Sequence, residues 1–482
     1  MVDKFEIANK NKIAFTKGQK IAIDGLIDFI DKPFDETKFV YGLVGAGGVG
    51  KTFVTKYILD NCKYSSSVIC CTAPTHKACR VFSQALGYKK VETIQSTFGF
   101  RIDLKIEDFD YRNPKFTPIN TPKIENVQLL VCDEASMLPA GLVQYMVNTC
   151  KEHKIKLILI GDASQLPPVK EKRSTAFTVC TKIFELTEIV RQNDTNPIIE
   201  LLNILRNDIK NGTHRGIEYI ARYKNQCVYN EYGEGFTVCN KNKFYELINL
   251  KFHDEEYTKN IDKYKIICYT NNCINAWNRI IRNDIIKDAD KTIINKNDLM
   301  MSYQTIVDDF NSTIINNSEE YIIQDIVSFV DGKYGFKGFM VKFQLVNGGT
   351  ITKPLFVVDN TDKVTMIKYI NVIEELVNSA KRATGGTRTK KWKEYYEFKQ
   401  KYLILNNIVD NFGRIVYPRD LDYAFAVSAH KSQGSTYDNV FVDMNDMMYD
   451  KNGMIYRDIN ELNRRLYVAC SRSKKDLIIC YE

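Results

Sequence analysis

The stretch Phe39-Val-Tyr-Gly-Leu-Val-Gly45-Ala-Gly-Gly-Val-Gly-Lys51-Thr52 decides the fold of this chain. Its first half is a short apolar run, which is typical of a buried strand. Its second half matches the pattern G-x-x-x-x-G-K-[ST], whose glycines let successive backbone N–H groups point at phosphate oxygens. The stretch therefore predicts a phosphate-binding loop between a strand and a helix. A glycine-rich turn before a core helix is the weaker alternative.

Within this loop we expect Lys51 to reach the β and γ phosphates of a nucleoside triphosphate, and the Thr52 hydroxyl to bind Mg²⁺. An acidic pair, Asp133-Glu134, follows the apolar run 127–132. In open α/β sheets, ligands bind at the carboxyl ends of the strands. We therefore expect Asp133 to hold Mg²⁺ and Glu134 to orient and deprotonate an attacking water.

Apolar runs of strand length recur along the chain, and helical patterns separate most of them. This alternation predicts an α/β fold with parallel sheets covered by helices. The runs fall into two groups and so predict two α/β lobes. They are Phe39–Val44, Val68–Cys71, Val127–Cys132 and Ile155–Ile160, and then Lys265–Thr270, Ala424–Ser428, Val440–Asp443 and Leu477–Tyr481.

Two stretches, 93–126 and 297–415, break this rhythm and read as insertions. The first contains Pro114, Pro118 and Pro122. The second contains an alternating pattern over 341–352 that turns at Asn347-Gly348, which predicts a β-hairpin within a small barrel.

Two helical patterns, 363–382 and 388–407, follow in the second insertion with Gly385-Gly386 between them, and predict a helical hairpin. We favour a core role for its apolar side chains over DNA contact. The side chains in question are Ile367, Ile370, Ile373, Val377, Trp392, Tyr395, Tyr396 and Tyr402.

The composition excludes several classes of protein. The 482 residues are 44% hydrophobic and 26% charged, as in globular chains of two to four domains. No apolar run reaches the roughly 18 residues of a membrane span, and the N-terminus carries no secretory signal. The net charge of +8 permits a polyanionic partner. The 13 cysteines lack C-x-x-C pairs, so we expect reduced thiols in a cytoplasmic protein and no zinc or iron–sulfur site.

Further motifs follow in a fixed order. Together with the phosphate loop they make the chain resemble the superfamily-one helicases of subgroup B, especially the RecD-like and phage Dda-like DNA helicases. The motifs are Gly45–Thr52, Asp133–Ser136, Gly161–Pro168, Val427–Gly434 and Arg465–Arg472.

The resemblance implies two RecA-like P-loop lobes with ATP and Mg²⁺ bound between them. Residues 1–92 and 127–182 would form the first lobe, and 183–296 and 416–482 the second. Residues 93–126 would form a pin that wedges the duplex. Residues 297–415 would form an SH3-like accessory domain with the helical hairpin.

The resemblance also assigns roles around the nucleotide. Gln19 would read adenine through its amide, and Gln165 would couple the γ-phosphate to DNA. Two arginines would neutralise charge on the transferring phosphoryl group. The implied catalytic residues are Lys51, Glu134, Gln165, Arg191 and Arg472. The implied nucleotide contacts are Gln19, Gly45, Gly47, Gly48, Val49, Gly50, Lys51, Thr52, Phe53 and Gln433.

Other loops at the sheet ends would contact DNA. Gln95 stands where relatives often have His. Phe98 is a candidate for the base of the pin, and a core role is the alternative. The implied DNA contacts are Pro74, Thr75, His76, Thr93, Ser96, Phe98, Asn271, His430, Lys431 and Ser432.

The resemblance implies an ATP-dependent DNA helicase that moves 5′ to 3′ on single-stranded DNA through closure of its lobes. We expect a monomer that acts at single-strand/duplex junctions, in the host cytoplasm if a phage encodes it, and that works beside replisome or single-strand-binding proteins in replication, recombination or repair. Two alternatives stay open from the residues alone. One is an RNA-directed helicase of the same superfamily, because nothing here reads a 2′-hydroxyl. The other is a nucleotide-gated DNA-binding subunit without unwinding activity.

Overall fold

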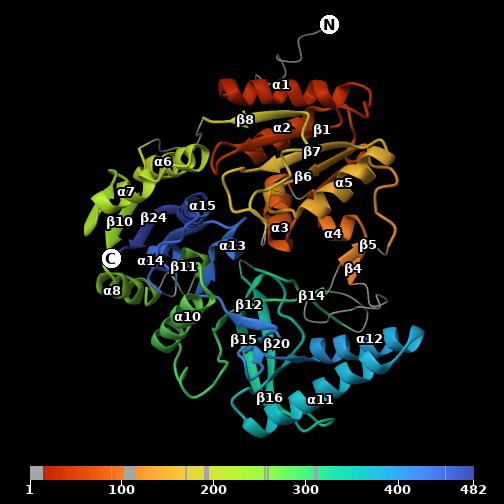
Figure 1. Ribbon diagram of the computed structural model, residues 1–482, viewed down its shortest axis with the longest axis vertical. Helices are drawn as coiled ribbons and strands as arrows, with labels where there is room; N and C mark the ends of the chain where they lie inside the picture. Colours follow the sequence, from red (N-terminus) through yellow and green to blue (C-terminus); the bar gives the residue numbers. More distant parts are fainter. Residues whose placement is uncertain are drawn as a thin grey trace. The chain divides into compact units, whose positions relative to one another are not determined.

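The computed structural model describes residues 15–87, 89–102, 116–118, 120–168, 171–188, 195–254, 257, 260–308, 313–346, 348–450 and 452–482. The chain forms two compact units (Figure 1). Unit 1 comprises Met1–Pro74, Ala78–Thr97 and Lys123–Thr195, and unit 2 comprises Thr75–Lys77, Phe98–Pro122 and Asn196–Glu482. None of the described helices has both the length and the apolar character that a membrane crossing needs. The domain boundaries expected from sequence stay predictions.

Unit 1 is built on a six-stranded, all-parallel sheet in the order β3-β2-β6-β7-β1-β8. All four apolar runs expected in the first lobe are strands of this sheet, so the predicted parallel α/β fold is confirmed. The strands are β1 (Val40–Gly45), β2 (Ile69–Ala73), β3 (Val91–Thr93), β6 (Leu129–Cys132), β7 (Lys156–Gly161) and β8 (Lys182–Leu186).

Helices cover this sheet. They are α1 (Lys17–Asp31), α2 (Lys51–Asn61), α3 (His76–Ala85), α4 (Ile94–Thr97) and α5 (Ala140–Glu152), with 3₁₀ turns η2 (Ser66–Val68) and η3 (Ala135–Met137).

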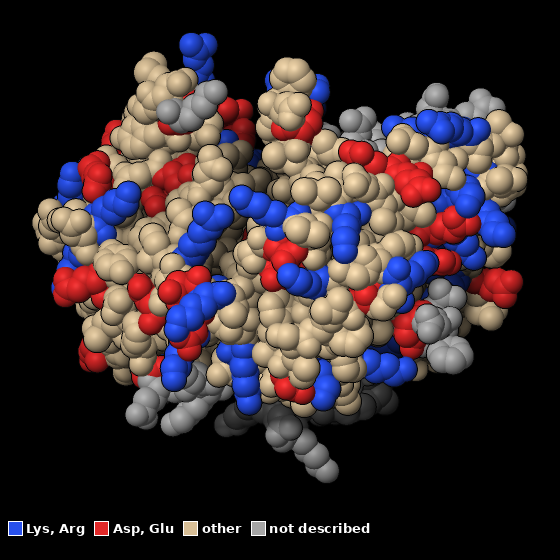
Figure 2. All heavy atoms as spheres, turned by 90° about the horizontal axis from the view of Figure 1, so that it is seen from below, with Lys and Arg blue, Asp and Glu red and all other residues tan. Residues whose placement is uncertain are grey.

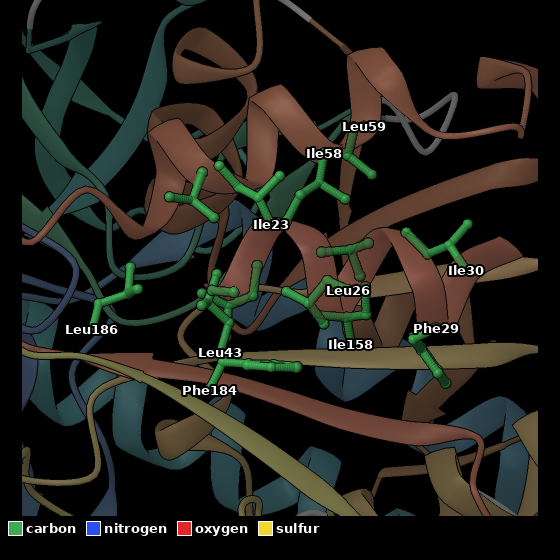
Figure 3. Close-up of a cluster of buried hydrophobic side chains, with 14 of the residues drawn as sticks. Ile23, Leu26, Phe29, Ile30, Leu43, Ile58, Leu59, Ile158, Phe184 and Leu186 are labelled. Carbon is green, nitrogen blue, oxygen red and sulfur yellow. The ribbon is translucent and has the colours of Figure 1, made fainter. Parts of the chain in front are cut away.

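The core between α1, α2 and the sheet fixes the position of the phosphate loop. Apolar side chains of α1, among them Ile23 and Leu26, lie against Leu43 of β1 and Phe184 of β8 (Figure 3). The approach of α1 is close: a Cβ atom at Gly25 would lie 2.2 Å from the Phe184 ring. Removing such large apolar groups from water supplies most of the favourable energy of this contact.

One buried lysine joins the end of α1 to the sheet. Lys156 of β7 donates from its Nζ to the carbonyls of Phe29 (2.8 Å) and Ile30 (2.9 Å), and to that of Lys32. The last carbonyls of a helix have no partner within it, so a cation there satisfies them and also favours the negative end of the helix dipole.

Unit 2 contains a second parallel sheet, in the order β10-β24-β23-β11-β22. The later apolar runs form four of its strands, which confirms the second predicted α/β lobe. The strands are β10 (Gly235–Cys239), β11 (Tyr264–Cys268), β22 (Ala426–Ser428), β23 (Tyr437–Asp443) and β24 (Ser473–Cys480). Its helices are α6 (Pro197–Asn211), α7 (Arg215–Arg222), α8 (Lys241–Phe252), α10 (Asn271–Ile285), α13 (Ala429–Ser432), α14 (Met444–Met448) and α15 (Ile459–Cys470), with η4 (Ile261–Lys263) and the short strand β9 (Gln226–Tyr229).

The larger insertion carries a six-stranded sheet in the order β18-β17-β16-β15-β12-β21, antiparallel except for the pair β17–β18. Its expected SH3-like character stays a prediction. The strands are β12 (Leu299–Ser302), β15 (Glu320–Val330), β16 (Lys337–Leu345), β17 (Leu355–Val358), β18 (Tyr402–Leu403) and β21 (Leu421–Tyr423); two small ribbons pair β13 (Ile306–Val307) with β14 (Thr313–Ile315) and β19 (Ile408–Val409) with β20 (Ile415–Tyr417).

The hairpin expected over 341–352 differs from the observed one. β16 pairs with β17, so that Val341 faces Leu355, and the second strand begins three residues after the expected hairpin ends. Asn347 lies outside the described residues. Residues 350–352 continue the alternation of apolar and polar side chains but do not belong to a strand. Thr352 N nevertheless donates a hydrogen bond to Phe343 O of β16 (2.8 Å).

The predicted helical hairpin is confirmed as α11 (Lys363–Arg382) and α12 (Gly385–Lys401), which lie side by side (Figure 1). The glycine pair opens α12 instead of forming the loop, and α12 ends at Lys401 because the next residues pair with β17. Trp392, Tyr395 and Tyr402 are core residues, as favoured from sequence.

The buried face of α11 differs from the expected one. It is formed by Tyr369, Ile373, Val377 and Ala380, whereas Ile367 is 60% exposed. The expectation for Ile367 was wrong because the buried residues recur every three or four positions from Tyr369 onward. This spacing defines one face of the helix, and Ile367 points away from it.

The smaller insertion contains an antiparallel ribbon of β4 (Phe100–Ile102) and β5 (Phe116–Pro118), in the segment expected to form the pin. Residues 103–115 between them lie outside the described part of the chain. Gly99 has φ +69, and a Cβ there would meet the Asn120 carbonyl at 2.1 Å, so the base of this ribbon requires glycine.

Two buried ion pairs bind the insertion to the second sheet. Arg282 of α10 forms a two-pronged pair with Asp298, at 2.8 Å from Nε and 3.0 Å from Nη2. Lys265 of β11 pairs with Glu320 of β15 (3.2 Å) and also donates to Ala424 O (2.7 Å). Both members of each pair are almost fully buried.

We predict that Asp298→Ala destabilises the protein by about 3–5 kcal/mol, because it leaves the Arg282 guanidinium buried without its counter-charge. Urea unfolding followed by circular dichroism measures the loss. The control is Glu246→Ala, which removes an exposed pair with Lys243 and should cost about 0–1 kcal/mol. Equal shifts for the two variants would contradict the assigned role of the Arg282–Asp298 pair.

Candidate nucleotide site and nucleic-acid interface

The phosphate loop leaves the carboxyl end of β1 and opens α2, as predicted. Gly48 and Gly50 both have φ +85, a conformation that side chains disfavour. A Cβ at Gly47 would meet nothing within 4 Å, whereas one at Gly45 would lie 2.6 Å from Leu186 O. The loop is therefore packed on its sheet side and open where its backbone amides can bind an anion.

Lys51 is the first residue of α2, and its ammonium group lies across the loop. Its Nζ donates to Gly45 O (2.8 Å) and Ala46 O (2.9 Å). These two carbonyls hold the charge beside the backbone amides, where it can also reach phosphate oxygens. Of the other expected loop contacts, Val49 is fully buried, whereas Phe53 is 44% exposed and lies near the ring of Phe15 (5.6 Å between centroids).

Gln19 is buried between the start of α1 and the loop. Its Nε2 donates to Val49 O (3.1 Å), and its Oε1 accepts from the N–H of Thr16 (3.1 Å). A Cβ at Gly50 would lie 2.7 Å from Gln19 Nε2, so the two residues fit only because residue 50 is glycine. The Gln19 amide keeps one N–H group and one oxygen lone pair for other partners. The expected contact with adenine would use these two positions.

The acidic pair lies at the same edge of the sheet, directly after β6. Glu134 has φ 49, and its Oε2 is buried with no hydrogen-bond partner among the described residues. A non-glycine residue in this conformation together with a buried acceptor that lacks a donor is costly, and such costs are concentrated at functional sites. A water held by Glu134 would satisfy this oxygen.

The surroundings of the Asp133 carboxylate favour a bound cation. Burial raises the pKa of its carboxyl, and the neighbouring Glu134 raises it further, while Lys51 opposes the rise. A divalent cation beside two crowded carboxylates relieves this repulsion. The Asp133 carboxylate and the Thr52 hydroxyl are the hard oxygen ligands that Mg²⁺ prefers, so the residues present fit this ion.

The loop after β7 approaches the acidic pair closely. A Cβ at Gly161 would lie 3.4 Å from the N–H nitrogens of both Ala135 and Ser136. Asp162 then makes a tight turn in which Gln165 N donates to Asp162 O (3.2 Å). Gln165 is thereby fixed at the same sheet edge, as the sequence led us to expect, and is 6% exposed.

Arg472 follows α15 in unit 2, and its guanidinium is buried and held by its own unit. Nε donates to Val468 O (3.1 Å), Nη1 to Ser435 O (3.0 Å) and Nη2 to Ser471 Oγ (2.9 Å). Ser435 follows the motif that contains Gln433, which is also buried. The structure thus links these two predicted residues within one unit. Arg191 lies outside the described residues.

The expected DNA contacts of the first lobe lie at the ends of β2 and β3. Pro74 and Thr75 follow β2, and His76 begins α3; burial lowers the pKa of the His76 imidazole, which favours its neutral form. Thr93 ends β3, and its Oγ1 accepts from Ser96 N (3.3 Å).

Two of the expected DNA contacts, Ser96 and Phe98, interact with other parts of the protein in this structure. Ser96 Oγ donates to Glu92 (3.2 Å) and accepts from Lys123 (3.2 Å). Phe98 has no exposed surface, so its ring offers no stacking face in this structure and the core role applies.

In unit 2, Asn271 begins α10 and is exposed, so it is accessible to a ligand. His430, Lys431 and Ser432 form most of α13. Lys431 Nζ donates to Ser318 Oγ (2.8 Å), and burial lowers the pKa of this lysine to about 8, with help from the nearby Arg419. Ser432 is fully buried and donates to Ala429 O (2.8 Å), so its hydroxyl supports α13. Its contact with DNA stays a prediction.

Arg465 begins the last of the helicase-like motifs, and no role was predicted for it from the sequence. Its guanidinium lies 3.5 Å from the ring centroid of Tyr269 and 4.2 Å from that of Tyr456, and it pairs with Glu461 (2.6 Å). The available signal was the Glu-to-Arg spacing of four residues along one helix face.

The positive charge of the chain is dispersed on the face seen in Figure 2, where Lys and Arg side chains alternate with Asp and Glu. That face therefore has no broad basic area that would attract a polyanion. The loops at the sheet ends stay the expected DNA contacts.

Comparisons with known proteins agree with this arrangement. Residues 27–226 match the family described as AAA domain, and residues 423–480 match the UvrD-like helicase C-terminal domain. The chain is 23% identical to the ATP-dependent DNA helicase dda of Enterobacteria phage T4, over 96% of this chain and 98% of that protein. It is also 23% identical to the RecBCD enzyme subunit RecD of Buchnera aphidicola, over 91% and 69% of the two chains. In fold it resembles the Pif1 helicase from Bacteroides, solved with ADP-AlF3 and ssDNA (TM-score 0.50, 17% identity, 97% and 92% covered).

We predict that Lys51→Ala lowers the rate of ATP hydrolysis by about 10²-fold or more, because the loop loses the cation that stabilises the transferring phosphoryl group. Steady-state hydrolysis assays with single-stranded DNA measure the loss, and DNA binding should stay detectable. Lys151→Ala, which changes an exposed lysine of α5, is the matched control. Undiminished hydrolysis in Lys51→Ala would refute the assignment of the phosphate loop.

Proposed function

Because the chain belongs to the superfamily-one helicases of subgroup B, with RecD-like and Dda-like relatives, we propose that it is an ATP-dependent helicase that moves along single-stranded DNA and unwinds duplexes. The observation that carries this proposal is the set of Lys51, Asp133 and Glu134 at one edge of the first parallel sheet, accompanied by a second parallel sheet whose unit holds Gln433 and Arg472.

The residues of the first unit account for hydrolysis of the triphosphate. The loop amides and Lys51 bind the phosphates, and Glu134 accepts a proton from the attacking water, for which its unpaired buried oxygen is suited. Mg²⁺, held by Thr52 and Asp133, would neutralise charge on the phosphate oxygens. Gln165 would sense the γ-phosphate from the loop after β7.

Movement requires that hydrolysis be coupled to a change between the two lobes. We propose that Arg472 reaches the γ-phosphate from the second lobe only when the lobes close on ATP, and that Arg191 joins it there. Because the hydrogen bonds of the Arg472 guanidinium go to groups of its own unit, it would move with that unit as one body. Alternating closure and opening, with a grip on DNA that differs between the two states, gives directional stepping.

The DNA strand would run along the ends of both sheets, at Thr75, His76 and Thr93 in the first lobe and at Asn271, His430 and Lys431 in the second. Contacts to phosphates position the strand without reading its sequence, so binding would tolerate many sequences. We propose movement from 5′ to 3′, a wedge formed by 93–126, and a cover over the strand formed by 297–415.

The wider setting is proposed on the same basis. We propose a monomer that acts in the cytoplasm, that of the host if a phage encodes it, at junctions of single-stranded and duplex DNA. Replisome or single-strand-binding proteins would be its partners in replication, recombination or repair.

One experiment tests activity, substrate and polarity together. Duplexes that carry only a 5′ single-stranded tail or only a 3′ tail, made of DNA or of RNA, are mixed with protein and ATP, and strand separation is followed. We expect unwinding of the DNA with the 5′ tail. Preference for RNA would favour the RNA-directed alternative, and ATP hydrolysis without strand separation would favour a nucleotide-gated binding subunit.

We predict that Arg472→Ala lowers kcat for DNA-stimulated ATP hydrolysis by about 10³-fold or more if this guanidinium stabilises the transition state. Arg472→Lys keeps the positive charge but cannot form the same fork, so it should stay slow while it folds normally. Hydrolysis and the melting temperature are measured for both variants. A loss of tenfold or less in a folded Arg472→Ala protein would leave this arginine with a structural role only.

A further inference from the structure

Two thiols and two carboxylates meet on the second sheet, outside the proposed nucleotide site. Cys268 ends β11, Cys273 lies in the first turn of α10, Asp443 ends β23, and Asp446 lies in α14. One donor atom each from Cys268, Cys273 and Asp446 lie within 4.8 Å of one another. Asp443 Oδ2 is 3.4 Å from Cys273 Sγ. We call these four residues the Cys–Asp cluster.

The two carboxylates of the cluster have no counter-charge. Neither Asp443 nor Asp446 takes part in an ion pair in the described part of the chain, although Asp443 is 8% exposed and Asp446 is half-buried. Carboxylates that leave water usually require a cation or a full set of hydrogen bonds. A divalent cation would supply the missing charge at this point.

Hydrogen bonds hold both carboxylates in a fixed orientation. Asp446 Oδ2 accepts from the N–H groups of Tyr269 (2.6 Å) and Thr270 (2.8 Å), and Asp443 Oδ2 accepts from Trp277 Nε1 (3.0 Å). Outer contacts of this kind orient the ligands of protein metal sites. Asp446 Oδ1 accepts only from the Thr270 hydroxyl among the described residues and so keeps a free lone pair.

We propose that Cys268, Cys273 and Asp446, with Asp443 in the fourth position, bind a tetrahedral divalent cation of the zinc class. Zinc bonds of about 2.3 Å to sulfur and 2.0 Å to oxygen give a tetrahedron whose edges are about 3.3–3.8 Å. The 3.4 Å between Cys273 Sγ and Asp443 Oδ2 already matches such an edge, and the donor atoms of Cys268, Cys273 and Asp446, which lie within 4.8 Å of one another, would have to draw closer to complete the shell. The absence of C-x-x-C pairs had led us to expect no zinc site from the sequence.

The proton balance of binding is closed. Thiols without a bound metal are protonated at neutral pH. When the cation enters, each thiol gives one proton to solvent and each sulfur donates an electron pair to the metal. Two positive charges enter and two leave, so the net charge of the cluster does not change.

A bound cation would join three segments of unit 2. It would connect the end of β11, the first turn of α10 and the start of α14. Two of its ligands, Cys268 and Cys273, precede and follow Asn271 in the sequence. This role is structural and does not depend on helicase activity, so it can succeed or fail independently of the proposed function.

Cobalt substitution tests the site directly. Untagged full-length protein is reduced, freed of metal with a chelator, and titrated with Co²⁺. We expect stoichiometric binding, with sulfur-to-cobalt charge-transfer absorption and the visible bands of tetrahedral Co²⁺, which excess Zn²⁺ then removes. Cys268→Ser and Cys273→Ser should each abolish the charge-transfer absorption, and Asp446→Asn should weaken binding by about tenfold or more.

The control is Cys227→Ser, which changes an exposed thiol on β9 and should leave the spectrum intact. Thiol alkylation gives a second readout that needs no variant: Zn²⁺ should protect Cys273, the partly exposed thiol of the cluster, while Cys227 still reacts. Absorption that survives both cluster serines, the lack of charge-transfer bands in the wild-type protein, or a Cys268–Cys273 disulfide formed under mild oxidation with no metal protection would each overturn the proposal.

Discussion

The parallel pairing of β1 with both β7 and β8 is the constraint on which the proposed site depends. Because all six strands of this sheet run the same way, the segments that follow β1, β6 and β7 emerge at one edge. The phosphate loop, the acidic pair and the Gln165 turn thus meet although more than a hundred residues separate the first from the last. The core beneath α1 and α2 keeps this edge rigid, because a close-packed interior is hardly compressible.

Local backbone requirements then refine what the sheet brings together. The left-handed conformation of Glu134 and the positive φ of Gly48 and Gly50 are tolerated because their neighbours are fixed on both sides. Gln19 illustrates how tightly the parts fit, since its amide caps the start of α1 and also holds the loop through Val49. A helix cap and a ligand loop therefore share one side chain, and disturbance of either would affect the other.

The sequence predicted the two sheets, the phosphate loop and the helical hairpin, because apolar runs and glycine spacing are local signals. It could not predict which of several apolar positions would face the core of α11, where Tyr369 is buried and Ile367 is exposed. It also could not separate Ser432 from the neighbouring residues of its motif, since only the packing of α13 buries that hydroxyl. The Cys–Asp cluster was invisible for a related reason: β11 and β23 become neighbours only in the folded sheet, and their ends lie about 170 residues apart along the chain.

The buried pair of Lys265 and Glu320 has a consequence for the history of this chain. Lys77 also pairs with Glu320 (3.6 Å), so three charges share this site. A charge left alone in the interior costs several kcal/mol, whereas apolar side chains that replace the whole group can carry little penalty. Substitutions at Lys77, Lys265 and Glu320 would therefore be tolerated together but scarcely one at a time. Substitutions in the inserted sheet would then be accepted only together with matching substitutions in the lobe that carries it.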